Sequence, residues 1–190
     1  MILGKCLIFS APSGSGKTTI VHHLLDQDLK LEFSVSASSR KPRTGEINGK
    51  DYYFLSLAQF KEKIERSEFL EWEEVYEGQL YGTMRSEIER IWNKGNHVIF
   101  DVDVKGGMNL KKVFGERALS IFIKPPSIEE LSKRLHVRST DNEAEIQRRL
   151  AKAQEEMKYA PLFDIQIENN ILEDTQAKAT RIVSNFVKSK

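Results

Sequence analysis

The feature of this sequence that most constrains its fold is the small-residue segment 13–18, Ser-Gly-Ser-Gly-Lys-Thr. It follows the apolar run 6–10, which predicts a buried strand, and it leads into residues 18–25, whose apolar side chains recur at helical spacing. Strand, small-residue loop and helix in this order are typical of the start of an α/β fold. Backbone N–H groups in such a loop converge on an anion, and the helix N-terminus adds partial positive charge. The segment therefore predicts a phosphate-binding loop whose Lys17 reaches the outer phosphates.

The expected ligand of this loop is a nucleoside triphosphate with Mg²⁺, because the Thr18 hydroxyl can ligate the metal. A second apolar run, 98–100, ends in Asp101, and a strand that delivers a carboxylate toward Mg²⁺ is the second feature of such sites. The strict loop pattern has glycine where this chain has Ala11, a difference that matters only if the backbone there is left-handed. A glycine-rich turn with an incidental lysine is the alternative. The expected triphosphate-binding residues of the loop are Ala11, Pro12, Ser13, Gly14, Ser15, Gly16, Lys17, Thr18 and Thr19.

Apolar and capping patterns extend the α/β prediction along the chain. Residues 97–102 and 119–123, and more weakly 165–167, have the composition of central parallel strands. After the first helix, apolar side chains alternate with serines over residues 33–38, which favours a small, partly antiparallel subdomain at 34–83 inserted into the parallel core. A Ser or Thr with Glu or Gln three residues later marks the start of a helix. Such starts lie at Ser56, Ser127 and Thr140.

Composition excludes several classes of protein. Lys and Arg number 29 and Asp and Glu 28, so the net charge of +1 argues against binding of nucleic acid through bulk positive charge. The single cysteine, Cys6, cannot form an internal disulfide, which favours a reducing compartment. No apolar run approaches the length of a signal-peptide core or a membrane span. We therefore expect no membrane contact and a cytoplasmic location.

Two arginines in a proline-containing loop predict a second phosphate site. Arg40 and Arg43 lie three residues apart across Pro42, and Tyr52 follows them. Arginine donates bidentately to phosphate oxygens and a phenol adds a further donor, so this set suits one dianionic phosphate. A solvated basic loop is the alternative.

From Leu7 to about Asn170 the sequence closely resembles guanylate kinases. The resemblance rests on motifs that follow one another in order: the phosphate-binding loop, residues 36–46, 49–52, 69–71, 81–83 and 101–103, and the arginines Arg134, Arg138 and Arg149. It implies that the phosphate of GMP is held by Arg40, Arg43, Tyr52 and Tyr81. It also implies that guanine is read by Ser36, Glu71, Thr83 and Asp103.

The chemistry of guanine agrees with this implied assignment. Guanine presents two adjacent N–H donors beside an acceptor oxygen, so the Glu71 carboxylate can accept from both donors while the Thr83 hydroxyl donates to the oxygen. Adenine would leave the carboxylate buried and unpaired, which is costly. A solvated charge at a helix end is the alternative for Glu71, and a cap at a strand end is the alternative for Asp103.

The resemblance also implies a three-layer α/β fold of the P-loop class. This fold has a parallel five-stranded core sheet, an inserted small α+β subdomain that binds GMP, and a helical lid. The whole chain, 1–190, is expected to form one domain. Within it, the core comprises residues 1–33, 84–130 and 151–190, the GMP-binding subdomain 34–83, and the lid 131–150.

Several cations are expected by this resemblance to stabilise charge on the transferring phosphoryl group, within a site whose closure excludes water. Surface arginines paired with neighbouring glutamates are the alternative for the lid. Asn169 matches the adenine-side residue of the family weakly, because the acidic pair that usually follows is missing. The expected catalytic residues are Lys17, Arg40, Arg43, Arg134, Arg138 and Arg149, and the expected metal ligands are Thr18 and Asp101, directly or through water.

Together these expectations describe a kinase that transfers the γ-phosphoryl group of ATP to GMP, giving GDP and ADP, with Mg²⁺ and as a monomer or homodimer. A related P-loop kinase of a phosphorylated sugar is one alternative, but it has no use for a guanine-reading carboxylate. A non-catalytic guanylate-kinase-like scaffold module that binds phosphopeptides is another, and such modules typically have a degraded phosphate-binding loop.

Overall fold

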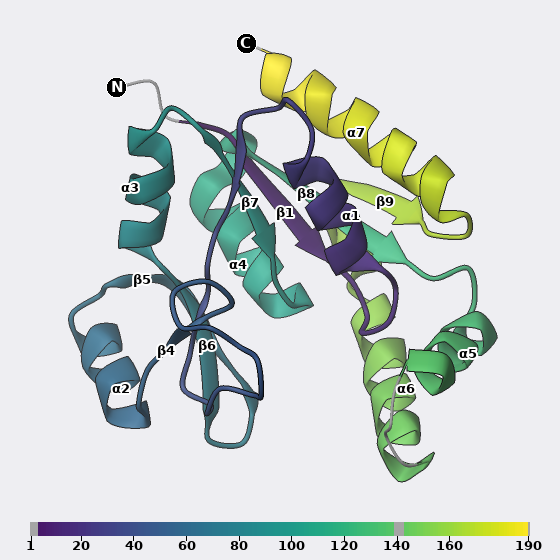
Figure 1. Cartoon of the computed structure of the whole chain (residues 1–190), viewed down its shortest axis with the longest axis horizontal. Coiled ribbons are helices and arrows are strands. Elements are labelled where there is room, and N and C mark those ends of the chain that lie inside the picture. Colours follow the sequence, from purple (N-terminus) through teal and green to yellow (C-terminus); the bar gives the residue numbers. More distant parts are fainter. Residues whose placement is uncertain (1–3, 139–142, 190) are drawn as a thin grey trace.

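The computed structural model of the chain describes residues 4–138 and 143–189, and its centre is a five-stranded parallel sheet (Figure 1). The strand order is β2-β7-β1-β8-β9, and every neighbouring pair is parallel. Continuous apolar runs form the central strands because both faces of a parallel sheet are covered. The strands are β1 (Cys6–Ser10), β2 (Leu31–Phe33), β7 (His97–Asp101), β8 (Ala118–Lys124) and β9 (Ile165–Glu168). The predicted parallel five-stranded core is confirmed.

Helices cover both faces of this sheet and complete three layers. Successive side chains of β1 point to opposite faces of the sheet. On one face, Leu7 and Phe9 pack against α1 (Lys17–Leu25) and α7 (Leu172–Lys188). Ile8 packs in the opposite cluster, with α3 (Arg85–Asn93) and α4 (Val104–Phe114). Short 3₁₀ turns precede β8 and β9, at Gly115–Arg117 and Ala160–Leu162. The three-layer α/β class predicted from the sequence is therefore the observed one.

A second, four-stranded sheet with the order β4-β3-β6-β5 forms a separate unit, here called the small sheet. Its strands are β3 (Ala37–Ser38), β4 (Tyr53–Phe54), β5 (Phe69–Tyr76) and β6 (Gln79–Met84), and α2 (Leu57–Glu65) packs on it. Strands β3 and β4 are parallel, whereas β3–β6 and β5–β6 are antiparallel, so this region is partly antiparallel as predicted. The alternating run 33–38 divides between the two sheets, because Phe33 ends β2 and Ala37 begins β3.

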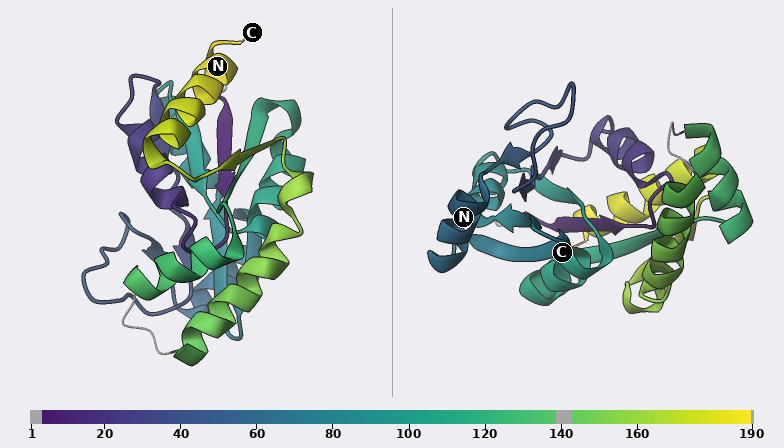
Figure 2. Two further views of the ribbon diagram at one scale, coloured as in Figure 1. Left: turned by 90° about the vertical axis from the view of Figure 1, so that its right-hand side faces the viewer. Right: turned by 90° about the horizontal axis from the view of Figure 1, so that it is seen from below.

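Two helices, α5 (Ile128–Arg138) and α6 (Glu143–Met157), pack against each other through Leu131, Leu135, Ile146 and Leu150. In Figure 1 this helix pair and the small sheet flank the carboxyl ends of the core strands, and Figure 2 shows them on opposite sides of the molecule when it is seen from below. The pair extends beyond the predicted lid boundaries at both ends.

The predicted helix starts are confirmed where the structure describes them. Ser56 forms both halves of a capping box with Gln59, and the Ser127 hydroxyl accepts a hydrogen bond from the Glu130 amide at 3.1 Å. The predicted start at Thr140 lies outside the described residues. Within residues 4–138 and 143–189, no helix has the length and apolar character required to cross a bilayer.

Candidate functional site

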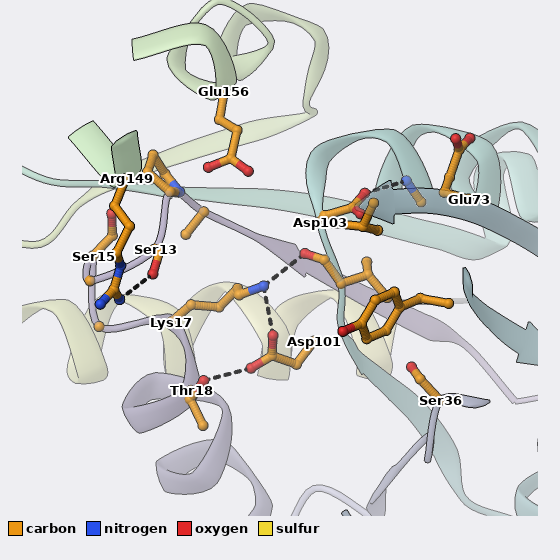
Figure 3. A pocket seen from close by; sticks show the side chains of 18 of the residues that line it. Ser13, Ser15, Lys17, Thr18, Ser36, Glu73, Asp101, Asp103, Arg149 and Glu156 are labelled. Atoms are coloured by element: carbon orange, nitrogen blue, oxygen red, sulfur yellow. Dashed lines mark hydrogen bonds and ion pairs between the residues drawn. The ribbon is translucent and has the colours of Figure 1, made fainter. Parts of the chain in front are cut away.

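A cleft of about 460 Å³ opens where strands β1 and β7 end (Figure 3). One wall is the phosphate-binding loop, and the segment that follows β7 contributes Asp101 and Asp103. The small sheet contributes a second wall, and α6 contributes a third through Arg149 and Glu156. Segments far apart in the sequence therefore meet here, because the carboxyl ends of parallel strands lie at one edge of a sheet.

The phosphate-binding loop has the backbone geometry that its glycines permit. Gly14 and Gly16 have φ angles of +92° and +89°, which residues with a Cβ rarely adopt. A Cβ on Gly16 would also lie 2.4 Å from Asn169 Nδ2. Asn169 is buried against the loop, where its amide donates to the Ser15 carbonyl at 2.8 Å. Asn169, predicted to contact ATP on its adenine side, therefore also supports the loop.

Ala11 replaces the first loop glycine without strain. In the part of the chain that the structure describes, the non-glycine residues with positive φ are Lys30 and Ser67. We therefore expect Ala11→Gly to leave KM for ATP unchanged and to lower stability by about 0.5–1 kcal/mol, because glycine has more conformational freedom in the unfolded chain. Steady-state kinetics with varied ATP and a thermal melt test this expectation. A markedly lower KM for ATP would show that the alanine costs binding.

Lys17, Thr18 and Asp101 form one linked group at the base of the cleft. Lys17 Nζ lies 2.6 Å from Asp101 Oδ1 and donates to the Val102 carbonyl at 2.7 Å. The Thr18 hydroxyl donates to Asp101 Oδ2 at 2.8 Å. Figure 3 shows all three side chains at the mouth of the loop. The structure thus brings the predicted phosphate-binding lysine and both predicted metal ligands together.

The residues predicted to hold the second phosphate are gathered only in part. Arg40 makes two hydrogen bonds of 2.6 Å to the Glu46 carboxylate and stacks over the Tyr52 ring at 4.9 Å. Tyr52 meets Tyr81 edge to face at 6.0 Å. The side chain of Arg43 is exposed, and its backbone amide donates to Glu46. The arrangement therefore collects one guanidinium and two phenols, with Arg43 beside them on the surface.

Glu46 is a residue whose role sequence reasoning missed. Hydrogen bonds from Arg40 and from the Arg43 amide hold the pKa of its carboxyl group down at about 2. The same Glu46 contact, with a contribution from Tyr81, raises the pKa of Arg40. A carboxylate thus occupies the donors that a phosphate would use. Its place six residues after Arg40 gives no signal of this pairing, because only the fold of the loop brings the two together.

Of the predicted guanine-reading residues, Ser36, Glu71 and Asp103 line the other side of the cleft, and Thr83 lies buried behind Glu71. The Thr83 hydroxyl, fully buried, donates to Glu71 Oε1 at 2.7 Å. Burial raises the pKa of Glu71, 9% exposed, from its ordinary value of 4.5 to about 7, although the hydrogen bond from Thr83 partly opposes this rise. Ser36 also lines the cleft. The alternative of a solvated helix-end charge is wrong for Glu71, because this residue is buried in β5.

Asp103 combines a structural contact with a place in the cleft. It is the N-cap of α4, where its Oδ1 accepts from the Gly106 amide at 2.8 Å. The capping alternative is therefore real, although the cap belongs to a helix rather than to a strand. A Cβ on Gly106 would lie 3.1 Å from Glu71 Oε2, so this glycine allows α4 to begin close against the buried carboxylate.

The three predicted lid arginines differ in position. Arg149 of α6 reaches the phosphate-binding loop, where Nη2 donates to the Ser13 hydroxyl at 2.7 Å. Arg134 of α5 donates from Nη1 to the Asn169 carbonyl at 3.1 Å and from Nε to Glu130. The side chain of Arg138 lies outside what the structure describes.

Glu156 is a second cleft residue that sequence reasoning missed. It lies on α6, is 8% exposed, and points into the cleft toward Lys17 (Figure 3). Burial raises the pKa of its carboxyl group, while Lys152 and Lys17 oppose the rise. Helical periodicity from Arg149 through Ala153 to Glu156 was the available signal, since positions three to four residues apart share a face.

Comparisons with known proteins agree along nearly the whole chain. The family model described as Guanylate kinase matches residues 3–186. The guanylate kinase of Bacteroides thetaiotaomicron is 52% identical over 97% of this chain and 90% of its own length. That of Porphyromonas gingivalis is 50% identical over 96% of this chain and 98% of its own length. Among solved structures, guanylate kinase from Anaplasma phagocytophilum aligns with a TM-score of 0.80 at 29% identity, covering 100% of this chain and 89% of that one.

Proposed function

The chain belongs to the guanylate kinase family and is an ATP:GMP phosphotransferase, and we propose that the cleft at the ends of β1 and β7 holds both nucleotides during transfer. One observation carries this proposal. The Lys17–Thr18–Asp101 group and Glu71, which accepts a hydrogen bond from the buried Thr83, line the same cleft on different walls. With the ATP triphosphate on the loop and guanine beside Glu71, the two nucleotides would therefore meet at their phosphates.

We propose that in each phosphate site the cation changes its partner from a carboxylate to a nucleotide phosphate when the nucleotide binds. In the structure Lys17 is paired with Asp101, and Arg40 with Glu46. A pre-existing counter-ion keeps each cation in place without leaving it unpaired in a partly buried position. A nucleotide phosphate offers the same type of oxygen acceptor, with more negative charge.

Transfer itself would depend on alignment and on charge stabilisation. A phosphate oxygen of GMP forms a bond to the γ-phosphorus of ATP as the bond from that phosphorus to the β–γ bridging oxygen breaks, giving GDP and ADP. Lys17, Arg40 and Arg149 would offset the negative charge of the reacting phosphates. Arg43, Arg134 and Arg138 remain candidates for the same role. No residue needs to form a covalent intermediate.

Thr18 and Asp101 fit a Mg²⁺ site of the kind that a nucleotide brings with it. A hydroxyl and a carboxylate oxygen lie 2.8 Å apart there. No group of three or more potential metal-ligating His, Cys, Asp or Glu side chains occurs in residues 4–138 and 143–189. Mg²⁺ typically takes one or two protein ligands and completes its shell with phosphates and water, so two protein ligands suffice. When bound, the ion would neutralise charge on the β- and γ-phosphates.

Thr18→Val should raise the Mg²⁺ concentration needed for half-maximal activity, because it removes the hydroxyl while keeping the shape of the side chain. Titration of Mg²⁺ at fixed ATP and GMP measures the effect, and chelation of the metal should abolish transfer. Thr18→Ser is the matched control, since it keeps the hydroxyl and should titrate like the parent chain. Identical titrations for the valine and serine variants would remove Thr18 from the metal site.

The pKa of Glu71 predicts that GMP binding weakens in acid. The carboxylate is the form that accepts both guanine donors, and burial raises its pKa to about 7. As the pH falls below that value the carboxyl group is protonated, so KM for GMP should rise about tenfold per pH unit. Binding should release a proton in the same range, because GMP favours the charged form.

Kinetics from about pH 5.5 to 8 test this prediction, with Glu71→Gln as the control because it cannot titrate. The phosphate of GMP titrates near pH 6 and affects both proteins equally, so the difference between the two profiles isolates Glu71. Parallel profiles would contradict the assignment.

Calorimetry with Mg²⁺–ATP and with GMP tests whether one chain binds both nucleotides. We expect one site for each. A chain that bound neither nucleotide would behave as a scaffold module. The cytoplasmic location, the lack of a nucleic-acid partner, the choice between monomer and homodimer, and the division into core, GMP-binding subdomain and lid stay predictions from the sequence.

A further inference from the structure

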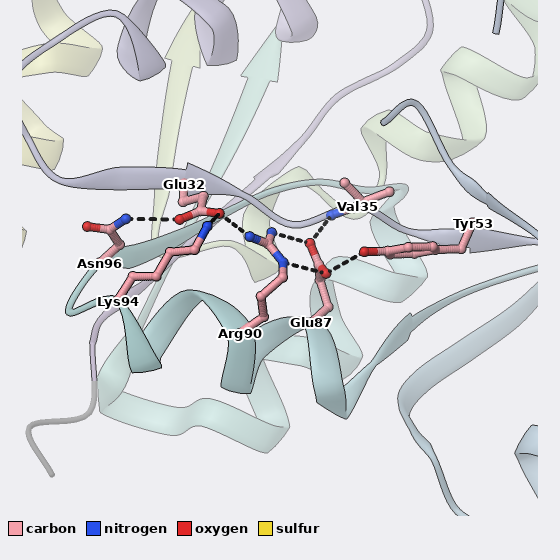
Figure 4. Close-up of polar contacts among 7 residues, drawn as sticks. All are labelled: Glu32, Val35, Tyr53, Glu87, Arg90, Lys94 and Asn96. Atoms are coloured by element: carbon pink, nitrogen blue, oxygen red, sulfur yellow. Dashed lines mark hydrogen bonds and ion pairs between the residues drawn. The ribbon is translucent and has the colours of Figure 1, made fainter. Parts of the chain in front are cut away.

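A chain of charged and polar side chains crosses the junction between the five-stranded sheet and the small sheet (Figure 4). It begins in the core at Glu32 of β2, which accepts hydrogen bonds from Lys94 and Asn96. Arg90 of α3 links Glu32 to Glu87, one turn earlier on the same helix. Glu87 then contacts the small sheet. None of these residues belongs to the cleft described above.

Glu87 joins the two places where the chain passes between the sheets. The first passage is residues 34–36, and the second lies between β6 and α3, just before Glu87. Glu87 Oε1 accepts from the Val35 amide at 3.0 Å, in the first passage. Its Oε2 accepts from the Tyr53 hydroxyl at 3.0 Å, in the small sheet. The carboxylate of Glu87 therefore links α3 to the first passage through Val35 and to the small sheet through Tyr53.

The Glu87 carboxylate is buried, 2% exposed, and is satisfied on both oxygens. Arg90 donates to Oε1 at 2.7 Å and to Oε2 at 3.0 Å. Burial alone would raise the pKa of Glu87, but the bonds from Arg90, the Val35 amide and Tyr53 hold it below its ordinary value. A buried, charged group with several fixed donors has one favourable position, so it restricts the orientation of what it binds.

The two partners of Glu87 outside α3 each adjoin a cleft residue in the sequence. Val35 precedes Ser36, and Tyr53 follows Tyr52. The two segments are also bonded to each other, because the Tyr53 amide donates to the Ser36 carbonyl at 2.9 Å. Ser36 and Tyr52 both line the cleft. The position of Glu87 therefore affects the positions of Ser36, a predicted guanine contact, and Tyr52, a predicted phosphate contact.

We propose that Glu87 is a positioning residue for GMP, which fixes the small sheet on the core through Val35 and Tyr53 and so places Ser36 and Tyr52 in the cleft. The proposal rests on the proposed function, because it takes the GMP side of the cleft to include these two residues. Glu87 does not touch the nucleotide. Its loss should affect the GMP side of the reaction and leave the ATP side unchanged.

Tyr53→Phe tests the proposal with the smallest change, because it removes one hydroxyl and keeps the ring that packs against the core of the small sheet. KM for GMP should rise roughly 2- to 10-fold, the equivalent of one lost hydrogen bond, with kcat and KM for ATP unchanged. Glu87→Gln should have a larger effect in the same direction. The double variant should be no worse than Glu87→Gln alone, because both changes break the same link. If Glu87→Gln fails to fold, Tyr53→Phe still decides the question.

Ser56→Ala is the matched control, because it removes the cap of α2 in the same unit without touching the junction. It should lower the melting temperature with KM for GMP unchanged. An unchanged KM for GMP in Tyr53→Phe, or an equal rise in Ser56→Ala, would overturn the proposal. Glu71→Ala tests the proposed GMP site separately from the positioning role of Glu87. If that variant raises KM for GMP and Tyr53→Phe does not, only the positioning role fails, whereas no effect of Glu71→Ala would count against the proposed GMP site itself.

Discussion

Lys17→Ala should lower kcat by about 10²- to 10³-fold, the usual loss when one preorganised hydrogen-bond donor to developing negative charge is removed. Lys17 lies at the base of the phosphate-binding loop, with Nζ 2.6 Å from Asp101 and directed into the cleft. The proposed GMP site is formed by other segments, so the Kd for GMP should stay nearly the same. Most of the loss should therefore appear in kcat, because the charge on the reacting phosphates is greatest during transfer.

Steady-state kinetics with calorimetry for GMP separate turnover from binding in this variant. Lys112→Ala is the matched control, since it removes an exposed lysine of α4 that does not line the cleft. The control should retain the parent kcat. An intact kcat in Lys17→Ala would show that the loop does not act in the reaction.

Glu71→Ala should lower kcat/KM for GMP by about 10²- to 10⁴-fold, because two hydrogen bonds to a charged acceptor are lost. The effect on AMP should be small or favourable, since AMP no longer leaves a buried carboxylate unpaired. Selectivity between the two bases should therefore collapse. This result follows from the burial of Glu71 and from its contact with Thr83, which together leave the carboxylate facing the space for the base.

The same two acceptors, GMP and AMP, are measured in parallel for Glu71→Ala and for the control Glu77→Ala, which changes an exposed glutamate in the turn after β5. The control should keep the parent ratio. If Glu71→Ala also kept it, guanine would have to be read by other residues.

The core could be predicted from the sequence because buried parallel strands leave an unambiguous pattern. The apolar run 6–10 is β1, the run 97–102 extends one residue past β7, and the run 119–123 is one residue shorter than β8 at each end. The phosphate-binding loop was equally predictable, since its glycines have the positive φ angles that their residue type allows. In these segments local pattern and tertiary environment agree.

The small sheet was harder to predict, because its strands lack a regular alternation of apolar and polar residues. Strand β5 reads Phe-Leu-Glu-Trp-Glu-Glu-Val-Tyr, and so many acidic residues are not typical of a strand. Pairing with β6 makes it a strand and buries Glu71 against Thr83. Propensity alone does not contain this information, because the stability of such a strand comes from its neighbours.

The carboxylates that act between separate segments were the hardest residues to predict. Glu46 on Arg40, Glu156 opposite Lys17, and Glu87 between Val35 and Tyr53 each depend on the final packing of separate segments. These three carboxylates surround or support the cleft. For Glu46 and Glu87 no signal exists in the sequence, because a glutamate in a polar segment is most often a solvated charge, whereas Glu156 shares a helix face with Arg149.

The most direct test of the account is a panel of monophosphate acceptors, GMP, AMP, CMP and UMP, at fixed Mg²⁺ and ATP, with ADP formation as the readout. The geometry around Glu71 and Thr83 predicts that GMP is strongly preferred over the other three. Comparable rates with AMP would contradict the assignment of the cleft.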